Sequence, residues 1–403
     1  MNLEAIRQDF LVLHKKINGK LPVYFDNACM SLRPRQVIEA MQKYYEEYPA
    51  CGGRSGHKFA KMVTDKTTAA RETIAKFINA KKKEEVVFTR NATEGINLVA
   101  HSLGLKKSDV VLTTDREHNS NLIPWQILVK KVGIKHHIVK SNPDNTFNLE
   151  NFKAELQKGV KLVAMVHTSN LDGVSIPIKE IVKLAHKTGA KVLLDSAQSA
   201  PHIGIDVRDL DVDFMVMSGH KMLGPSGTGI LYGKYEHLEA MEPFMVGGST
   251  VKFTTYTDYE LLPPPEKFEA GLQDYAGIIG FAEAVRYLEK IGFKAVQKHD
   301  FELNKFITDE IKSIPKLHII GPADPAQRSG IVSFYVDGLD THKIALMLDA
   351  SANVMVRSGQ HCVHSWFHAH GITASVRASL YFYNTMHEAE IFVDALKKTI
   401  AIL

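Results

Sequence analysis

The chain has 403 residues, of which 45% are hydrophobic and 23% are charged, and its formal net charge is +4. This length can bury one large and one smaller α/β core, and the small, dispersed charge argues against a nucleic acid partner. No run of about 20 apolar residues is present to cross a bilayer, and the polar segment 1–20 lacks the apolar core of a signal peptide. Three cysteines in so long a chain do not make a disulfide framework, so the cytoplasm is the expected compartment.

The pattern along the first half of the chain predicts a layered α/β domain. An N-terminal helix is expected within residues 1–20, packed on a smaller domain. From residue 85 to 235, short apolar runs alternate with helical patterns, which is typical of a mainly parallel sheet covered on both faces. The seven predicted strands lie at 85–90, 109–114, 135–139, 161–167, 191–196, 213–218 and 229–233.

The second half predicts a smaller α+β domain. Three consecutive prolines, Pro263 to Pro265, indicate an irregular crossover over 261–269, and a long helical pattern follows at 275–313 with a break near Gly292. The expected boundaries are 1–20 for the N-terminal helix, 21–285 for the large domain and 286–403 for the small domain. The later predicted elements lie at 317–321, 330–336, 341–350, 353–359, 375–380 and 387–400.

One lysine directly follows a predicted buried strand. Lys221 ends the segment Ser218-Gly-His-Lys, which comes after the apolar run 213–217 and is followed by several glycines. Ligands of open α/β sheets bind beyond the carboxyl ends of the strands. A lysine that loses water there has a lowered pKa and a nucleophilic amine. The alternative is a surface lysine in a turn, which the Ser-Gly-His context disfavours.

Two other strand ends carry polar residues that suit a cofactor. Asp195 follows the apolar run 192–194, and a carboxylate there can keep a pyridinium nitrogen protonated. Without Lys221, Asp195 would be interpreted as a helix N-cap. Thr93 lies where a strand turns into a helix, and the free N–H groups at such a helix start bind phosphate. The alternative for Thr93 is a plain helix cap.

A cysteine and several histidines lie near the C-terminus. Cys362 ends the segment Arg357-Ser-Gly-Gln-His-Cys, and the neighbouring histidine and arginine favour the thiolate, the nucleophilic form of the side chain. The histidines at 364, 368 and 370 could instead hold a metal. We rank that alternative low because a single cysteine accompanies them and because they fit a loop or one helix face.

Taken in order, these motifs resemble those of the cysteine desulfurases, and more narrowly of their group II branch, which includes selenocysteine lyase-like enzymes. These proteins belong to the class V aminotransferase family of fold-type I pyridoxal 5'-phosphate (PLP) enzymes. The resemblance extends from about residue 23 to 396, and it implies PLP as the cofactor and a homodimer as the assembly. It is carried by Thr93-Glu, Asp195…Gln198, Ser218-Gly-His-Lys221, Arg357-x-Gly-x-His-Cys362 and Arg377-Ala-Ser-Leu-x-x-Tyr-Asn.

The resemblance implies a role for each residue at a cofactor-binding position. Lys221 would bind PLP as a Schiff base and later move protons, and His118 would stack on the pyridine ring. Asp195 would pair with the ring nitrogen, and Gln198 would hydrogen-bond the phenolic oxygen. The residues assigned to the phosphate are Thr93, Ser218 and His220, together with Gly271, which would reach the phosphate site of the partner subunit.

For the substrate, the resemblance assigns the carboxylate of L-cysteine to Asn170, Arg357 and Arg377, since a guanidinium binds a carboxylate through two hydrogen bonds. Cys362 would attack the substrate sulfur. The implied reaction converts L-cysteine to L-alanine and leaves a persulfide on the enzyme. A sulfur-acceptor or scaffold protein would then take the sulfur, for iron–sulfur cluster assembly or for thiolation. No metal, nucleic acid or membrane is expected.

Several positions depart from the usual family pattern. Leu272 stands where the family usually has threonine, so phosphate binding there would rest on backbone N–H groups, and Gln360 replaces a histidine. Cys29 and Cys51 fall in segments near the family's active-site mouth, so all three cysteines are expected near one cleft. The two are small buried hydrophobic residues, or Cys51 relays sulfur from Cys362 or helps to bind a metal.

Two other kinds of function stay open. Another class V enzyme, such as a selenocysteine lyase, amino acid lyase, epimerase or aminotransferase, would not require Cys362. A catalytically altered protein that handles sulfur or metal would not require Lys221, Asp195 and Arg377 together. The intact set of residues therefore favours a desulfurase.

Overall fold

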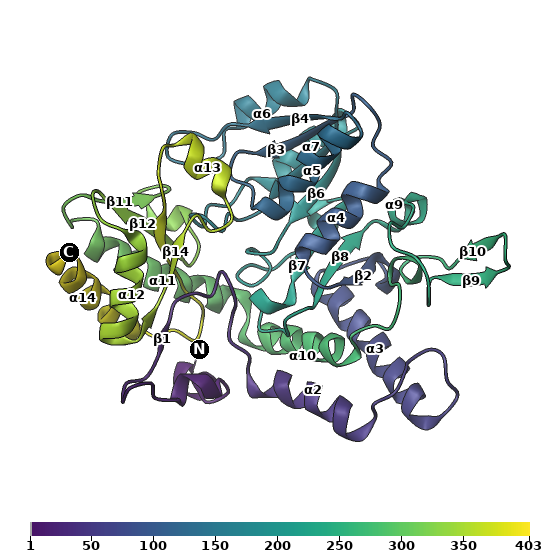
Figure 1. Ribbon diagram of the computed structural model, residues 1–403, viewed down its shortest axis with the longest axis horizontal. Helices are drawn as coiled ribbons and strands as arrows, with labels where there is room; N and C mark the ends of the chain where they lie inside the picture. The colour runs from purple at the N-terminus through teal and green to yellow at the C-terminus, as the bar shows by residue number, and fades with distance from the viewer. Residues whose placement is uncertain (1) are drawn as a thin grey trace.

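A large sheet forms the centre of the computed structural model, which describes residues 2–403 (Figure 1). In that range the sheet has seven strands in the order β2-β8-β7-β6-β5-β3-β4. β8 is antiparallel to both neighbours and the other adjacent strands are parallel, which confirms the predicted sheet. The strands are β2 (Val86–Thr89), β3 (Val110–Thr114), β4 (Lys135–Val139), β5 (Val160–Val166), β6 (Lys191–Asp195), β7 (Phe214–Ser218) and β8 (Gly229–Gly233).

Helices cover both faces of this sheet because successive side chains of a strand point to opposite faces. In β6, Val192 and Leu194 pack in one hydrophobic core and Leu193 packs in the other. On the Leu193 side the covering helices are α4 (Ala92–Ser102), α5 (Ile123–Lys131) and α9 (Tyr235–Ala240). On the opposite side they are α2 (Arg35–Glu47), α3 (Lys58–Phe77), α6 (Leu149–Leu156), α7 (Ile178–Lys187), α8 (Val207–Leu210) and α10 (Tyr275–Ile291).

A second, smaller sheet has its own hydrophobic core. Its antiparallel order is β11-β12-β15-β14, and this confirms the predicted smaller C-terminal domain. Among residues 2–403, no helix is both long and apolar enough to pass through a membrane. The elements here are β11 (Leu317–Ile320), β12 (Ile331–Val336), β14 (Arg357–Gly359), β15 (Ser375–Ser379), α11 (Phe293–Ile311), α12 (Thr341–Ala352), α13 (His364–Ala369) and α14 (Met386–Ile402).

The N-terminal segment differs from its prediction. Instead of one helix, residues 2–20 contain α1 (Leu3–Arg7) and a 3₁₀ turn (Leu11–His14). Arg7 Nη2 contacts Glu388 Oε1 of α14 at 2.7 Å. β1 (Val23–Tyr24), which falls within the predicted large domain, pairs with β13 (Val354–Met355), and Val23 packs in the smaller core. We propose that the large domain begins after β1.

The predicted boundary between residues 285 and 286 falls inside a helix. α10 continues without interruption to Ile291, so a division between residues 285 and 286 would cut a helix. Gly292 has φ +82°, a left-handed conformation that favours glycine, and α11 begins at the next residue. The predicted break near Gly292 is therefore present. We propose it as the junction between the two domains.

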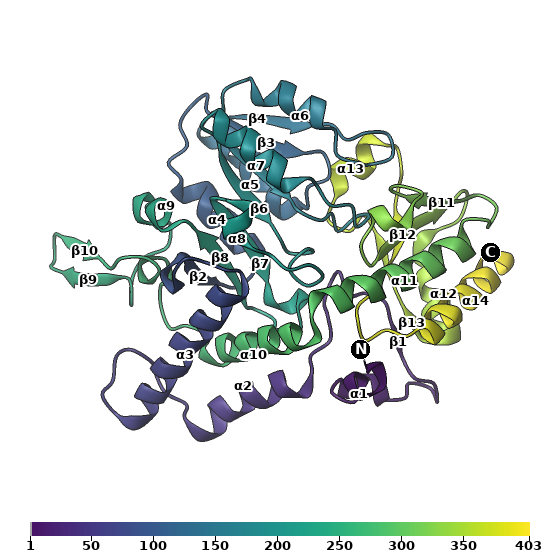
Figure 2. The ribbon, with the colours of Figure 1, turned by 180° about the vertical axis from the view of Figure 1, so that it is seen from behind.

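A hairpin that the sequence analysis did not predict projects from the large domain. β9 (Val251–Thr254) pairs with β10 (Tyr259–Leu261), and both ribbon views show the pair extending away from the body (Figures 1 and 2). Most of its side chains are exposed, so it lacks the apolar alternation that marks a half-buried strand. The predicted crossover at 261–269 follows and contains only a short 3₁₀ turn (Glu266–Phe268).

Candidate active site

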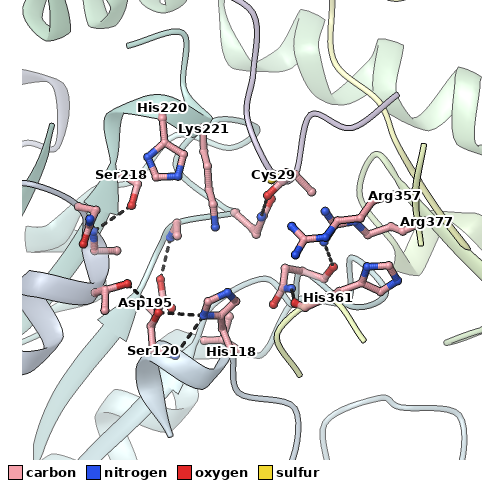
Figure 3. A pocket seen from close by; sticks show the side chains of 18 residues that line it. Cys29, His118, Ser120, Asp195, Ser218, His220, Lys221, Arg357, His361 and Arg377 are labelled. Atoms are coloured by element: carbon pink, nitrogen blue, oxygen red, sulfur yellow. Dashed lines mark hydrogen bonds between the residues drawn. The ribbon is translucent and has the colours of Figure 1, made fainter. Parts of the chain in front are cut away.

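A cavity of about 200 Å³ opens at the carboxyl ends of β5, β6 and β7 (Figure 3). Parallel strands bring their carboxyl ends to one edge of a sheet, so residues far apart in the chain meet there. The structure brings together ten of the twelve site residues that the sequence predicts, and only Cys362 and Gly271 do not line the cavity. The ten are Thr93, His118, Asn170, Asp195, Gln198, Ser218, His220, Lys221, Arg357 and Arg377.

Asp195 and Lys221 place opposite charges in this cavity. Asp195 is 4% exposed and its Oδ1 accepts a hydrogen bond from Ala197 N at 3.0 Å. Burial raises the pKa of Asp195, and the nearby Lys221 ammonium opposes that rise. Burial likewise lowers the pKa of Lys221, and Asp195 opposes that change. The pair can therefore present a carboxylate and a reactive amine to one ligand.

The start of α4 forms one wall of the cavity. Asn91, rather than Thr93, caps this helix, because Asn91 Oδ1 accepts a hydrogen bond from Glu94 N at 3.0 Å. The alternative of Thr93 as a plain cap is therefore wrong. The Thr93 hydroxyl instead lies 2.7 Å from Ser120 Oγ, and Ser218 Oγ accepts a hydrogen bond from Ala92 N at 2.9 Å. Hydroxyls and a helix start at one place suit a phosphate group.

His118 presents a neutral ring to the cavity. Its Nδ1 accepts a hydrogen bond from Ser120 N at 3.1 Å, so the proton of the neutral ring lies on Nε2. Burial, together with the nearby Lys221 and Arg377 charges, lowers the pKa of His118 to about 3. A flat, uncharged ring is suited to stacking on an aromatic ligand.

Glu117 does not line the cavity but holds the segments that form its wall, and the sequence analysis missed it. The carboxylate of this buried residue accepts hydrogen bonds from Thr114 Oγ1 at 2.6 Å, Asn121 Nδ2 at 2.7 Å and Val166 N at 2.9 Å. Burial raises the pKa of Glu117 to about 7. It joins the ends of β3 and β5 to the His118 turn. Its position beside a predicted site histidine was the available signal.

The other end of the cavity is rich in guanidinium groups. Arg377 is 1% exposed; its Nη1 donates to Asn170 O at 3.0 Å and its Nη2 contacts Asp26 Oδ1 at 3.3 Å. Arg357 lies directly opposite Arg377 in the β14–β15 register. Within residues 2–403, Arg377 Nε and Asn170 Oδ1 have no hydrogen-bond partner. Two guanidiniums against one carboxylate leave a positive surplus that suits a carboxylate ligand.

Cys362 lies at the edge of the site rather than in the cavity wall. Its sulfur is 3.8 Å from Arg357 Nη2, and its backbone oxygen accepts a hydrogen bond from Asn119 N at 2.7 Å. His361 and Cys362 both have positive φ, +49° and +61°, which is uncommon for residues with a side chain. Cys362 is partly exposed, and the arginine that its sulfur contacts does line the cavity.

The other two cysteines, Cys29 and Cys51, lie in different places. Cys29 lines the same cavity as Lys221, but Cys51 does not. Cys51 lies beside Tyr275, whose pKa is raised by burial and by the Cys51 charge. Within this chain Cys51 does not line the cavity, and its expected place near the active-site mouth stays a prediction.

Gly271 also lies outside the cavity. Its N–H donates to Gly248 O at 2.7 Å and its carbonyl accepts from Ser249 Oγ at 3.2 Å. The N–H of Gly271 is therefore already used within the chain, and its expected approach to the phosphate site of a partner subunit stays a prediction. The neighbouring Leu272 is 70% exposed.

The histidines after Cys362 have structural contacts. His364 Nδ1 lies 2.9 Å from Asn119 Nδ2, and the ring of His370 stacks on Trp366 with 4.1 Å between centroids. The described part of the chain, residues 2–403, contains no group of three or more His, Cys, Asp or Glu side chains placed to hold a metal ion. The geometry therefore gives the metal alternative no support.

Comparison with known proteins agrees with this architecture. A "Probable cysteine desulfurase" of Synechocystis sp. is 43% identical over 98% of this chain and 95% of that protein. The structure matches an apo cysteine desulfurase from Thermococcus onnurineus NA1 with a TM-score of 0.94 and 38% identity, covering 99% of this chain and 98% of that one. It also matches a cysteine desulfurase from Escherichia coli, in an S-sulfonic acid form, with a TM-score of 0.92 and 30% identity. This match covers 100% of this chain and 99% of that one.

A family model supplies the assignment. The model described as aminotransferase class-V matches residues 23–392, which include both sheets and every residue of the cavity. The chain belongs to the class V aminotransferase family.

Proposed function

We propose that this chain is a PLP-dependent cysteine desulfurase, which converts L-cysteine to L-alanine and takes the sulfur on Cys362. The observation that carries the proposal is one cavity with a buried lysine–aspartate pair at one end, two arginines at the other, and a thiol at its edge. The names of the full-length relatives support the same reaction.

The residues of the cavity fit PLP. Lys221 offers a primary amine, Asp195 a buried carboxylate and His118 a neutral ring. Thr93, Ser218 and the start of α4 offer donors for a phosphate. When bound there, PLP supplies an electron sink for charge that develops at the substrate Cα.

The buried pair would manage the protons of the reaction. Asp195 would hold a proton at the ring nitrogen, because a buried carboxylate stabilises a neighbouring cation. Lys221, whose pKa burial lowers, would take the proton from the substrate Cα and later return one to carbon. Gln198 is fixed against Ala28 O through its Nε2 at 2.7 Å and would hydrogen-bond the phenolic oxygen of the cofactor.

The arginine end would orient L-cysteine. Arg377 would bind the substrate carboxylate through Nε, which has no partner within residues 2–403, with Arg357 beside it. Asn170 would donate the second N–H of its Nδ2, since the first is donated to His361 O at 2.7 Å. In the sulfur step, Cys362 Sγ forms a bond to the substrate sulfur while the bond from that sulfur to Cβ breaks. The electron pair stays on carbon, which a proton then converts to the methyl group of alanine. The Arg357 guanidinium would favour the anionic sulfur of Cys362.

The test is product analysis with purified PLP-loaded protein, an excess of a reducing thiol and L-cysteine. We expect alanine and sulfide in equal amounts from the native chain. Lys221→Ala should be folded but colourless and inactive, and Cys362→Ser should keep the cofactor but lose most sulfide release.

Cys51→Ser is the matched control, because this thiol lies outside the cavity. Full activity of Cys362→Ser with L-cysteine would contradict the assignment of the nucleophile. It would favour the alternative of a lyase that needs no protein thiol, for which selenocysteine is the substrate to compare.

The assembly and the recipient of sulfur belong to the same proposal. We infer a homodimer, supported by exposed apolar side chains that gather in one stretch of the chain, among them Val246, Phe253 and Leu272. A second copy placed there would let the segment around Gly271 approach its partner's phosphate site.

A sulfur-acceptor or scaffold protein would collect the sulfur from Cys362. The three free cysteines agree with the cytoplasm as the compartment.

A further inference from the structure

Among the described residues, Cys29 is the one cysteine that lines the active-site cavity, and the proposed reaction does not use it (Figure 3). Two contacts fix its loop against the cavity. Gln198 Nε2 donates to the carbonyl of the preceding residue, Ala28, at 2.7 Å. Cys29 N donates to Asp26 O at 3.1 Å, and Asp26 Oδ1 in turn contacts Arg377. The loop that carries Cys29 is therefore held at the cavity wall by Gln198, near Asp195, and by Asp26, which contacts Arg377.

The surroundings of Cys29 are those of a ligand site. Asn170 and Arg377 line the same cavity, and Asn170 Oδ1 and Arg377 Nε are buried without a hydrogen-bond partner within residues 2–403. The pKa of Lys221 is lowered chiefly by burial, and charge at both Cys29 and Cys362 opposes this. Burial also lowers the pKa of Arg377, and charge at Cys29 opposes that change as well. Both sulfurs thus lie within electrostatic reach of the same lysine.

We propose that Cys29 is a second sulfur carrier, which accepts sulfur from the Cys362 persulfide inside the cavity. This inference rests on the proposed desulfurase function. The Cys29 thiolate attacks the outer sulfur of the persulfide, and a bond forms between Cys29 Sγ and that sulfur. The bond from the outer sulfur to Cys362 Sγ breaks, and its electron pair leaves on Cys362 as a thiolate. The transferred sulfur keeps its proton and its oxidation state, so no external oxidant or reductant is needed.

Geometry favours this direction of transfer. A persulfide places its outer sulfur about 2 Å beyond Cys362 Sγ, which extends the reach of a thiol that lies at the cavity edge. Arg357 contacts Cys362 and lines the same cavity as Cys29, so its guanidinium would stabilise the Cys362 thiolate that leaves when the sulfur is transferred. Transfer would shelter the sulfur from solvent and free Cys362 to react again.

The experiment uses PLP-loaded enzyme, less than one equivalent of L-cysteine per active site and no external thiol. The thiols are alkylated after one turnover, the peptides are mapped by mass spectrometry for an added sulfur atom, and alanine is measured in the same sample. We expect added sulfur on both Cys29 and Cys362 in the native chain. Cys29→Ser should leave all of it on Cys362, and Cys362→Ala should carry none on Cys29.

Cys51→Ser is the matched control, and it should show the native distribution. Alanine formation with sulfur on Cys362 alone in the native chain would overturn the inference, and Cys29 would then be a small side chain of the wall. Added sulfur on Cys29 in Cys362→Ala would also overturn it, because Cys29 would then take sulfur from the substrate directly. Absence of alanine in the native chain would instead refute the desulfurase function on which the inference rests.

Discussion

At the scale of single residues, the site depends on charges that are buried and paired. Asp195 and Lys221 each lose water in the cavity, and each stabilises the charge of the other. An isolated charge in this position would be neutralised by a shifted pKa. Removing either charge would therefore shift the pKa of the other group further.

Asp195→Asn keeps the shape of the side chain and removes its charge. A hydrogen bond to a charged group contributes about 1.5–3 kcal/mol, so we expect kcat with L-cysteine to fall roughly 10- to 100-fold. PLP should also bind more weakly, which the visible absorption of dialysed protein would measure. Asp209→Asn is the control, since Asp209 forms an exposed ion pair with Lys179. Native kcat in Asp195→Asn would show that this carboxylate does not act on the cofactor.

At the scale of elements, a buried ion pair joins α3 to the segment that leads to Gly271. Arg71 Nη1 and Nη2 contact Glu269 Oε1 and Oε2 at 2.7 and 2.8 Å. Glu269 Oε1 also accepts a hydrogen bond from Phe88 N of β2 at 2.7 Å. One carboxylate thus holds a helix, an edge strand and an irregular crossover in a single arrangement.

Glu269→Ala should destabilise the fold strongly. Removing one partner of a buried pair leaves an uncompensated charge on Arg71, which costs about 3–5 kcal/mol. Urea unfolding followed by circular dichroism measures this loss. Asp65→Ala is the matched control, because Asp65 pairs with Lys61 at 3.7 Å on the exposed face of the same helix, where a pair contributes at most about 1 kcal/mol. Equal losses in the two variants would contradict the role of Glu269.

At the scale of the whole molecule, two cores are joined through the α10–α11 junction and through the return of the N-terminal segment to the smaller sheet. The active-site cavity lies between contributions from both, since Asp195 comes from the large sheet and Arg377 from the small one. A change in how the two domains pack would therefore alter the distance between Asp195 and Arg377 in the cavity.

Leu272→Asp tests the inferred homodimer. A charge on this exposed leucine would have to be buried in a subunit interface, so we expect dissociation to monomers and a loss of activity. Sedimentation or light scattering at several protein concentrations measures the mass. Leu346→Asp is the control, because Leu346 is exposed on α12 of the small domain, far along the chain from this segment. A native chain that is monomeric and fully active at high dilution would refute the dimer.

Buried neutral histidines predict how stability depends on pH. Burial lowers the pKa of His118 to about 3, of His167 to about 4 and of His361 to about 2, with nearby cations assisting at His118 and His361. An unfolded histidine has a pKa of about 6.5, so below that pH the unfolded chain binds more protons. The free energy of unfolding should therefore be highest above about pH 6.5 and should fall as the pH decreases toward 4.

Urea unfolding at a series of pH values gives the slope, to which each such group adds up to about 1.4 kcal/mol per pH unit. His167→Asn should reduce this slope between about pH 4 and 6.5. His387→Asn should leave it unchanged, because His387 is exposed at the start of α14. A slope that is flat in the native chain would contradict the burial of these rings.

The large sheet and most of the site residues could be predicted from the sequence, because both depend on short segments. Apolar runs of strand length predict strands wherever they occur, and a polar residue at the end of such a run must lie at the ligand-binding edge of a parallel sheet. Lys221 and Asp195 were found in this way. Tertiary structure alone decided which distant residues meet: Arg71 pairs with Glu269 across 198 positions, and Arg377 contacts Asp26 across 351. It also placed Cys29, and not Cys51, in the cavity. A local pattern records burial and hydrogen-bonding capacity, but the partner of a buried charge is set by how the elements pack.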